Sequence, residues 1–87
     1  MADVPVSGRV TGPDGAGLPG VTVLVRGTSV GTSTNTDGAF SLNAPEGSTL
    51  VFSFVGFTTQ TTTVAAGGGA VNINLKEDTQ KLNEVVV

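Results

Sequence analysis

Apolar and polar residues alternate with a period of two along most of this 87-residue chain, and turn-forming pairs rich in glycine and proline interrupt the alternation at short intervals. Successive side chains of a β-strand point to opposite faces, so this pattern predicts short strands with one buried face. The strands are expected at 4–10, 21–26, 31–35, 39–43, 49–55, 57–64 and 70–76. Seven short strands joined by turns predict an all-β fold, an antiparallel sandwich.

Three turn signals delimit these strands. Pro19-Gly20 favours a type II turn, in which glycine supplies the positive φ. Asp37-Gly38 predicts a tight hairpin between the third and fourth strands. Gly56 ends the most apolar strand, whose two faces both carry apolar residues, as is typical of a central strand. These turns are expected to serve the fold.

Two other glycine positions carry predictions of their own. Gly8 lies inside the first strand, where a missing side chain indicates a bulge or the close approach of another backbone. Gly67–Gly69 joins the last two strands and predicts a loose loop.

Composition excludes several classes of function. The chain has no His and no Cys, which removes the common catalytic bases, the thiol nucleophile and the usual transition-metal ligands. It has no Trp or Tyr for stacking sugars or bases, and its four Lys and Arg residues are scattered in a chain of net charge −3. No apolar run is long enough to span a membrane. We expect a non-enzymatic domain with no cofactor, metal, nucleic acid or direct membrane insertion, monomeric in isolation.

Carboxylates in two turns allow functional interpretations as a metal site or as catalytic acids. Asn35, Asp37 and Gly38 could form part of a Ca²⁺ loop, which needs oxygen ligands at alternate positions, but no bidentate carboxylate follows. Asp14 and Asp37 could be the acid pair of a glycosidase, but both precede glycine in turns, where Asp is favoured for local hydrogen bonding. The turn interpretation is favoured for all of them.

Other segments also have both a structural and a functional interpretation. The glycines of 27–31 could form a phosphate loop, but neither Lys-Ser/Thr nor a helix follows. The threonines of 58–63 and 33–36 could form an adhesive or ice-binding face, although outward Thr commonly covers a strand. Phe57 could be an exposed contact residue or a cover for the core edge. We favour a loop between strands for 27–31, an ordinary strand surface for the threonines and a cover of the core edge for Phe57.

The chain changes character after the last expected strand. Residues 77–81 are charged and polar, and residues 82–87 end in three consecutive valines. An unpaired apolar segment of this kind tends to pair as a strand, either with a partner's sheet or with an edge of its own domain. We expect residues 1–4 to be a leader or an added start, residues 5–76 the sandwich, and residues 77–87 a linker or extended tail, with the native protein continuing beyond Val87.

The turn-rich segments resemble a carboxypeptidase-regulatory-like domain. The matching residues are Val6 to Thr11, Leu18 to Val23, Gly27-Thr28, Gly31-Thr32 and Thr36 to Phe40, with Gly56-Phe57 at the family's Gly–aromatic pair, where Tyr is more usual. The resemblance covers about residues 5–76. It implies a seven-stranded, transthyretin-like (prealbumin-like) Greek-key sandwich.

The tail extends this resemblance. Leu82 to Val87 looks like the segment that joins such a domain to the plug of SusC/RagA-type TonB-dependent outer-membrane receptors of Bacteroidetes, where it serves as, or overlaps, the TonB box. By this resemblance Glu84, Val85, Val86 and Val87 would bind a partner. The implied partners are the receptor's plug and barrel and possibly TonB, on the periplasmic side of the outer membrane, although the first residues are not expected to form a signal peptide.

The resemblance implies an accessory N-terminal domain of an importer for glycans or peptides, acting by protein interaction or stabilisation. The alternative is a free-standing carbohydrate-binding or adhesive sandwich, which the absence of Trp and Tyr disfavours. Signal relay to an anti-sigma partner fits poorly, because the receptor domains with that role are α/β and no helix pair is expected here.

Overall fold

The computed structural model describes residues 3–78, and these form strands, turns and bends only. The strands are β1 (Asp3–Thr11), β2 (Thr22–Val25), β3 (Gly31–Ser33), β4 (Ala39–Pro45), β5 (Thr49–Ser53), β6 (Gln60–Thr63) and β7 (Gly69–Asn74). The predicted all-β fold with seven strands is confirmed. A search of the described residues finds no helix with the length and hydropathy of a membrane span.

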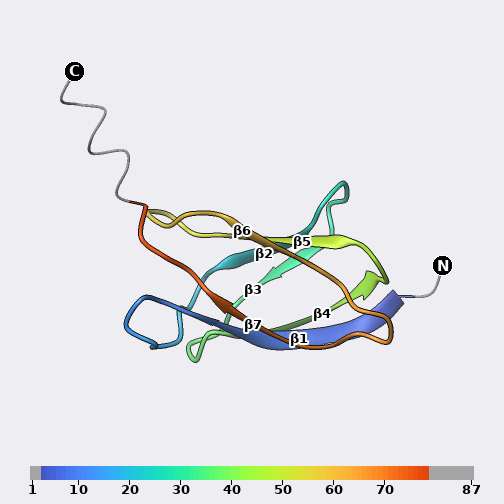
Figure 1. Cartoon of the computed structure of the whole chain (residues 1–87), viewed down its shortest axis with the longest axis horizontal. Helices are drawn as coiled ribbons and strands as arrows, with labels where there is room; N and C mark the ends of the chain where they lie inside the picture. The colour runs from blue at the N-terminus through green and yellow to red at the C-terminus, as the bar shows by residue number, and fades with distance from the viewer. Residues whose placement is uncertain (1–2, 79–87) are drawn as a thin grey trace, which may run out of the picture.

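The strands form two sheets that face each other (Figure 1). One sheet has the order β4-β1-β7 and the other β3-β2-β5-β6, with β5 in an interior position as its two apolar faces predict. Alternate residues of each strand point between the sheets, where Phe40 of β4 meets Phe52 of β5 edge to face at 5.4 Å between ring centroids. The buried apolar residues are Val6, Val10, Val21, Val23, Val25, Phe40, Ala44, Leu50, Phe52, Val64 and Leu75.

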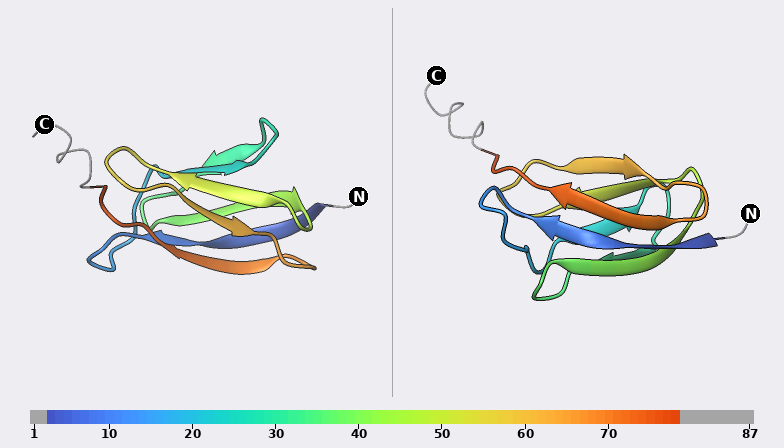
Figure 2. Two further views of the ribbon diagram at one scale, coloured as in Figure 1. Left: turned by 45° about the horizontal axis from the view of Figure 1, so that its top comes forward. Right: turned by 60° about the horizontal axis from the view of Figure 1, so that its bottom comes forward.

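The prediction that all strands pair antiparallel is wrong for one pair. β1 and β7 run parallel, from Val6 opposite Gly69 to Thr11 opposite Asn74, as the right-hand view of Figure 2 shows. Turns fix the relative direction only of strands that they join, whereas parallel neighbours need a longer connection. These two strands lie at opposite ends of the chain, so no turn signal reports their direction.

Gly8 allows this parallel pair to form. A Cβ atom on Gly8 would lie 1.8 Å from the carbonyl oxygen of Val71, directly opposite in the ladder. The structure therefore shows a close backbone approach at this position, one of the two possibilities that the sequence raised.

The hairpin predicted at Asp37-Gly38 is also only partly right. The chain does reverse there, since Asn35 N donates to the carbonyl oxygen of Ala39 at 2.9 Å. The two strands that it joins lie in different sheets, β3 beside β2 and β4 beside β1. The local turn chemistry sets the reversal of the chain, but pairing with other strands decides which sheet each arm enters.

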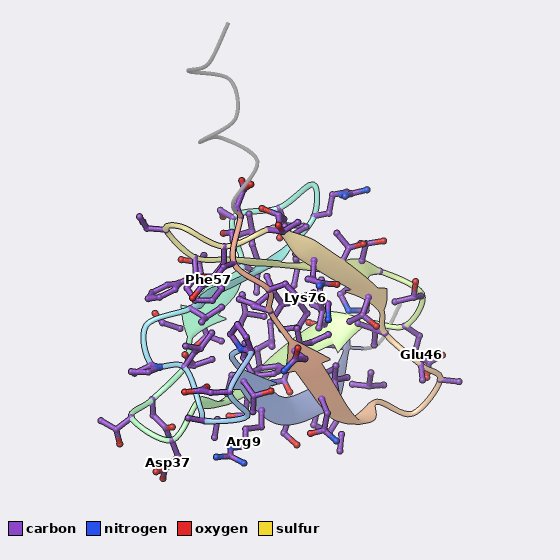
Figure 3. The ribbon with its side chains drawn as sticks, turned by 60° about the vertical axis from the view of Figure 1, so that its left-hand side comes forward. Arg9, Asp37, Glu46, Phe57 and Lys76 are labelled. Carbon is purple, nitrogen blue, oxygen red and sulfur yellow. The ribbon has the colours of Figure 1, made fainter. Side chains whose placement is uncertain are left out.

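The loop at Gly67–Gly69 is held in place, in contrast to the predicted loose loop. Gly67 N donates to Oε2 of Glu46 at 2.9 Å, and a Cβ on Gly68 would lie 2.1 Å from the carbonyl oxygen of Pro5. The loop therefore packs against β1 and the β4–β5 turn at the same time. Figure 3 shows Glu46 on the side of the molecule away from Asp37.

Candidate interaction surfaces

The edge strands of the two sheets lie next to each other on two sides of the sandwich. On the side between β6 and β7, hydrogen bonds join the two sheets. Thr58 N donates to the carbonyl oxygen of Lys76 at 2.9 Å, and Nε2 of Gln60 donates to that of Asn74 at 3.3 Å. The chain leaving β7 thus rises from one sheet to the other (Figure 1). We call this side the closed seam.

The last described residues continue along the closed seam toward the turn after β5. Phe57 and Glu77 form an antiparallel bridge, and Asp78 N donates to the carbonyl oxygen of Gly56 at 2.9 Å. Gly56 has a φ of +85°, within the turn in which Phe57 N donates to the carbonyl oxygen of Phe54. This turn therefore holds the last described residues, Glu77 and Asp78, against the sandwich.

The opposite side, between β3 and β4, is the open seam. No ladder joins these two edge strands within residues 3–78. A groove of about 420 Å³ lies between them instead, lined by Thr32, Ser33, Asn35, Ala39, Phe40 and Ser41. The floor of this groove is apolar, because Phe40 is buried in the core, and its walls are polar.

The free edge of β4 presents backbone groups to this groove. Val10 N donates to the carbonyl oxygen of Gly38, which sets the phase of the β1–β4 ladder. Residues of an antiparallel strand alternately turn their N–H and C=O toward and away from the partner, so Ser41 and Asn43 turn theirs away from β1. Pro45, the next outward position, has no N–H to pair.

Thr34 holds the start of the open seam against the rest of the sandwich. Its hydroxyl accepts from Val21 N at 2.9 Å and donates to the carbonyl oxygen of Leu18, so it is inserted across the turn at Pro19-Gly20. Gly20 has a φ of +78°. The residue is only 6% exposed, so residues 33–36 are not the outward threonine face that the sequence suggested. Sequence reasoning missed this role because a buried and a solvated strand Thr have the same local pattern.

The turn at Asp37-Gly38 uses its polar atoms internally. Oδ1 of Asn35 accepts from the backbone N of Asp37 and of Ala39, at 2.9 and 3.0 Å. Nε of Arg9 donates to the carbonyl oxygen of Asp37 at 3.0 Å, and Figure 3 shows the two residues side by side. Gly38 has a φ of +82° and packs on Val10. This geometry supports the turn interpretation over a Ca²⁺ loop.

The remaining candidate residues also lie in ordinary turns or strands. Oδ1 of Asp14 accepts from Ala16 N at 3.1 Å, and both residues are exposed. The hydroxyl of Thr28 donates to the carbonyl oxygen of Val25 and accepts from Val30 N, which closes the loop at 27–31. Within residues 3–78, no group of three or more acidic, His or Cys side chains is arranged to hold a metal ion.

A second groove lies at the end of the β3-β2-β5-β6 sheet that is next to the turn after β5. It has a volume of about 380 Å³, is mainly apolar, and is lined by Gly20, Thr22, Ser53, Phe54 and Val55. Val55 is 92% exposed, the highest exposure among the large apolar residues described. Phe57 is half-buried against Phe54, with ring centroids 5.6 Å apart, and packs on the core. We call this the Phe54–Val55 groove.

The structure describes the predicted turn residues but not the predicted partner-binding residues. The five turn positions lie as given above, around the ends of the sandwich. The predicted partner-binding residues, Glu84 to Val87, lie outside the described residues. The two grooves were not predicted from the sequence. The Phe54–Val55 groove joins segments far apart in the chain, and the groove of the open seam depends on β3 and β4 entering different sheets.

Comparison with known sequences gives a consistent result. The family described as CarboxypepD_reg-like domain matches residues 6–87. TonB-dependent receptor SusC of Bacteroides thetaiotaomicron is 43% identical over 84 residues, which cover 97% of this chain and 8% of the receptor. TonB-dependent receptor P39 of Formosa agariphila is 39% identical over 83 residues, or 94% of this chain and 8% of the receptor. The chain thus spans less than a tenth of the length of these curated relatives.

Comparison with solved structures shows the fold. A chain of the type II cohesin–X-dockerin complex from Acetivibrio cellulolyticus superposes with a TM-score of 0.66 at 19% identity, over 83% of this chain and 56% of the other. The group B streptococcus pilus 2b backbone protein gives a TM-score of 0.51 at 13% identity, over 92% and 43%. At these identities the likeness concerns the β-sandwich architecture.

Proposed function

This chain belongs to the CarboxypepD_reg-like domain family, and we propose that it is a non-enzymatic N-terminal accessory domain of a TonB-dependent outer-membrane importer for glycans or peptides. It would act on the periplasmic side by contacting and stabilising the rest of the receptor. The observation that carries the proposal is 43% identity to a TonB-dependent receptor across 97% of this chain. A match that fills this chain but only 8% of the receptor is what a small domain within a larger machine should give.

The physical character of the sandwich supports a contact role. Its polar side chains in the described turns bond to their own backbone, as Asn35 and Asp14 do, which leaves no assembled set of groups for acid–base work there. The open seam instead offers outward backbone groups at Ser41 and Asn43. An extended segment of the receptor could pair with this edge, main-chain hydrogen bonds supplying the affinity.

The tail is assigned a separate role as the partner-binding segment. Glu84, Val85, Val86 and Val87 form a short apolar stretch with one charge, suited to strand addition at the edge of a partner's sheet. The family match extends through residue 87, so this segment lies within the matched unit. By resemblance to the TonB box, its partner is TonB.

Deleting residues 5–76 from the full receptor, with residues 77–87 kept, tests the domain's role. We expect uptake or outer-membrane assembly of the receptor to fall, while the affinity of the assembled barrel for its substrate stays unchanged, because the ligand site is elsewhere. Uptake, receptor level and substrate binding are measured on the same strains. Normal assembly and uptake without the domain would contradict the proposal.

Ser41→Pro in the full receptor tests the open seam as the contact. The substitution removes an N–H that points away from β1, so it blocks strand addition while leaving the β1–β4 ladder intact. Ser41→Ala is the matched control, since it keeps the N–H and loses only the hydroxyl. We expect the proline variant alone to impair assembly or uptake. A positive glycan array with the isolated chain would instead favour the free-standing sugar-binding alternative.

A further inference from the structure

The Phe54–Val55 groove lies directly where the chain leaves the sandwich. Asp78 N is 2.9 Å from the carbonyl oxygen of Gly56, the residue that follows Val55. The bridge between Phe57 and Glu77 is antiparallel, so the chain at this point runs back along residues 57 and 56 toward 55. The last described residue therefore lies next to the groove.

The groove is chemically suited to an uncharged apolar segment. Its lining residues are uncharged, and it leaves Val55 92% exposed beside the partly buried ring of Phe54. Its volume of about 380 Å³ exceeds the roughly 150 Å³ of an apolar cavity that holds benzene. A large aliphatic side chain would fit and would cover Val55.

The same sheet continues the apolar surface beyond the groove. Leu24 of β2 lies opposite Val51 of β5 on the outer face, and Leu24 is 37% exposed. Val51 lies in β5 and is four residues before Val55, which is in the turn after that strand, so the two are at most about 13–14 Å apart along the chain. A segment that enters at the groove and runs back along β5 would meet this second apolar pair.

The chain beyond Asp78 has the matching pattern. Three polar residues follow, and Leu82 is the first large apolar one. Four residues span at most about 13–14 Å, which is enough to bring Leu82 to a groove that begins beside Asp78. The valines from Val85 onward would then lie over Leu24 and Val51, because an extended tail advances along the sheet at the rise of β5 itself.

We infer that the Phe54–Val55 groove is the resting site of the chain's own tail, with the side chain of Leu82 in the groove and Val85–Val87 over Leu24 and Val51. The domain would then compete with the partner for the tail, a consequence that rests on the partner-binding role proposed above. Release of Leu82 would be the step that exposes the tail.

A disulfide test on the full 87-residue chain measures the docking. The chain has no cysteine, so the double variant Leu82→Cys with Val55→Cys introduces the only possible pair. The matched control pairs Leu82→Cys with Val30→Cys. Val30 is an apolar residue 50% exposed at the other end of the sheet, where Val25 N bonds to it and Val25 lies opposite Leu50.

We expect the groove pair to close an intramolecular disulfide roughly tenfold or more faster than the control pair, because docking raises the local concentration of one thiol at the other. Equal rates for the two pairs would overturn the inference. A disulfide-linked dimer as the main product would also overturn it, since the tail would then occupy the groove of a second copy.

Leu82→Asp provides a second measurement without cysteines. We expect the amide resonances of Gly20, Thr22 and Ser53 to shift, because a charge at position 82 drives the tail out of an apolar groove. Those of Thr32 and Ser41 at the open seam should stay unchanged. Unchanged resonances at the groove would count against docking. Both tests use the isolated chain, so docking of the tail can fail while deletion of the domain still impairs uptake. Docking can also be observed while the deletion has no effect on uptake.

Discussion

The two seams of the sandwich differ in whether hydrogen bonds join the edges of the two sheets. At the closed seam, the chain after β7 crosses to the other sheet, and backbone bonds at Thr58 and Asp78 join the sheets. At the open seam, β3 and β4 diverge from the turn at 35–39 and leave a groove of about 420 Å³ between two free edges. Unpaired strand edges can pair with another chain, and this open edge is the surface that we propose for pairing with the receptor.

The difference also shows where each seam obtains its stability. The strand β7, which forms one side of the closed seam, is held against β1 by a backbone contact that leaves no room for a side chain, at Gly8 against Val71. The open seam depends on one buried side chain, Thr34, that bonds across a neighbouring turn. Substitutions at these positions should therefore have unequal effects, and the first should be the larger.

Gly8→Ala should have the largest effect, because it displaces β7, the strand that forms one side of the closed seam. The added Cβ would lie 1.8 Å from the carbonyl oxygen of Val71, and relief requires a shift of β7 away from β1. We expect a loss of about 3 kcal/mol or more in the free energy of unfolding, measured by urea denaturation. Hydrogen exchange at Ile73 should accelerate in the same variant.

Gly12→Ala is the control for the Gly8 variant. A Cβ at Gly12 would lie 3.4 Å from Leu18, an ordinary contact, and alanine restricts the unfolded chain. Its stability should change by less than about 1 kcal/mol. If both variants lose the same stability, the close approach at Gly8 is not what holds β7.

The features predicted from the sequence are those that depend on neighbouring residues. Alternation in 21–26 places Val23 inward and Leu24 outward, and both positions are confirmed, with Val23 fully buried. The same rule puts Val55 on the face opposite Phe54. A period of two is a local property of the strand, so it survives any choice of partner.

The features that were missed depend on which distant segments meet. The parallel pairing of β1 with β7 joins residues about as far apart as the chain permits, such as Thr11 and Asn74. The bond from Gly67 to Glu46 spans 21 residues, and neither residue carries a local signal for it. The Phe54–Val55 groove likewise exists only because Gly20 and Val55 come together from separate turns.

Thr34→Val tests the side-chain support of the open seam. Valine keeps the shape but leaves Val21 N and the carbonyl oxygen of Leu18 without their hydroxyl partner. We expect a loss of about 1–3 kcal/mol, the cost of buried polar groups left unpaired, measured by urea denaturation. Thr34→Ser should restore most of it.

Thr61→Val is the matched control for the Thr34 variant. Thr61 is an exposed threonine on β6, so the same substitution should change the stability by no more than about 0.5 kcal/mol. If Thr34→Val is as benign as Thr61→Val, the hydroxyl bridge contributes nothing and the open seam needs no such support.

Glu46→Ala should have the smallest effect and sharpens the account of the closed seam, because Glu46 holds the loop that leads from β6 into β7. The variant loses the acceptor for Gly67 N, at an expected cost of about 0.5–1 kcal/mol in the free energy of unfolding. Glu46→Gln keeps a side-chain oxygen and should retain most of the stability, while Glu77→Ala removes another exposed carboxylate and should have no effect. A glutamine variant as unstable as the alanine variant would show that the loop needs the charge of Glu46, and not only an acceptor at that position.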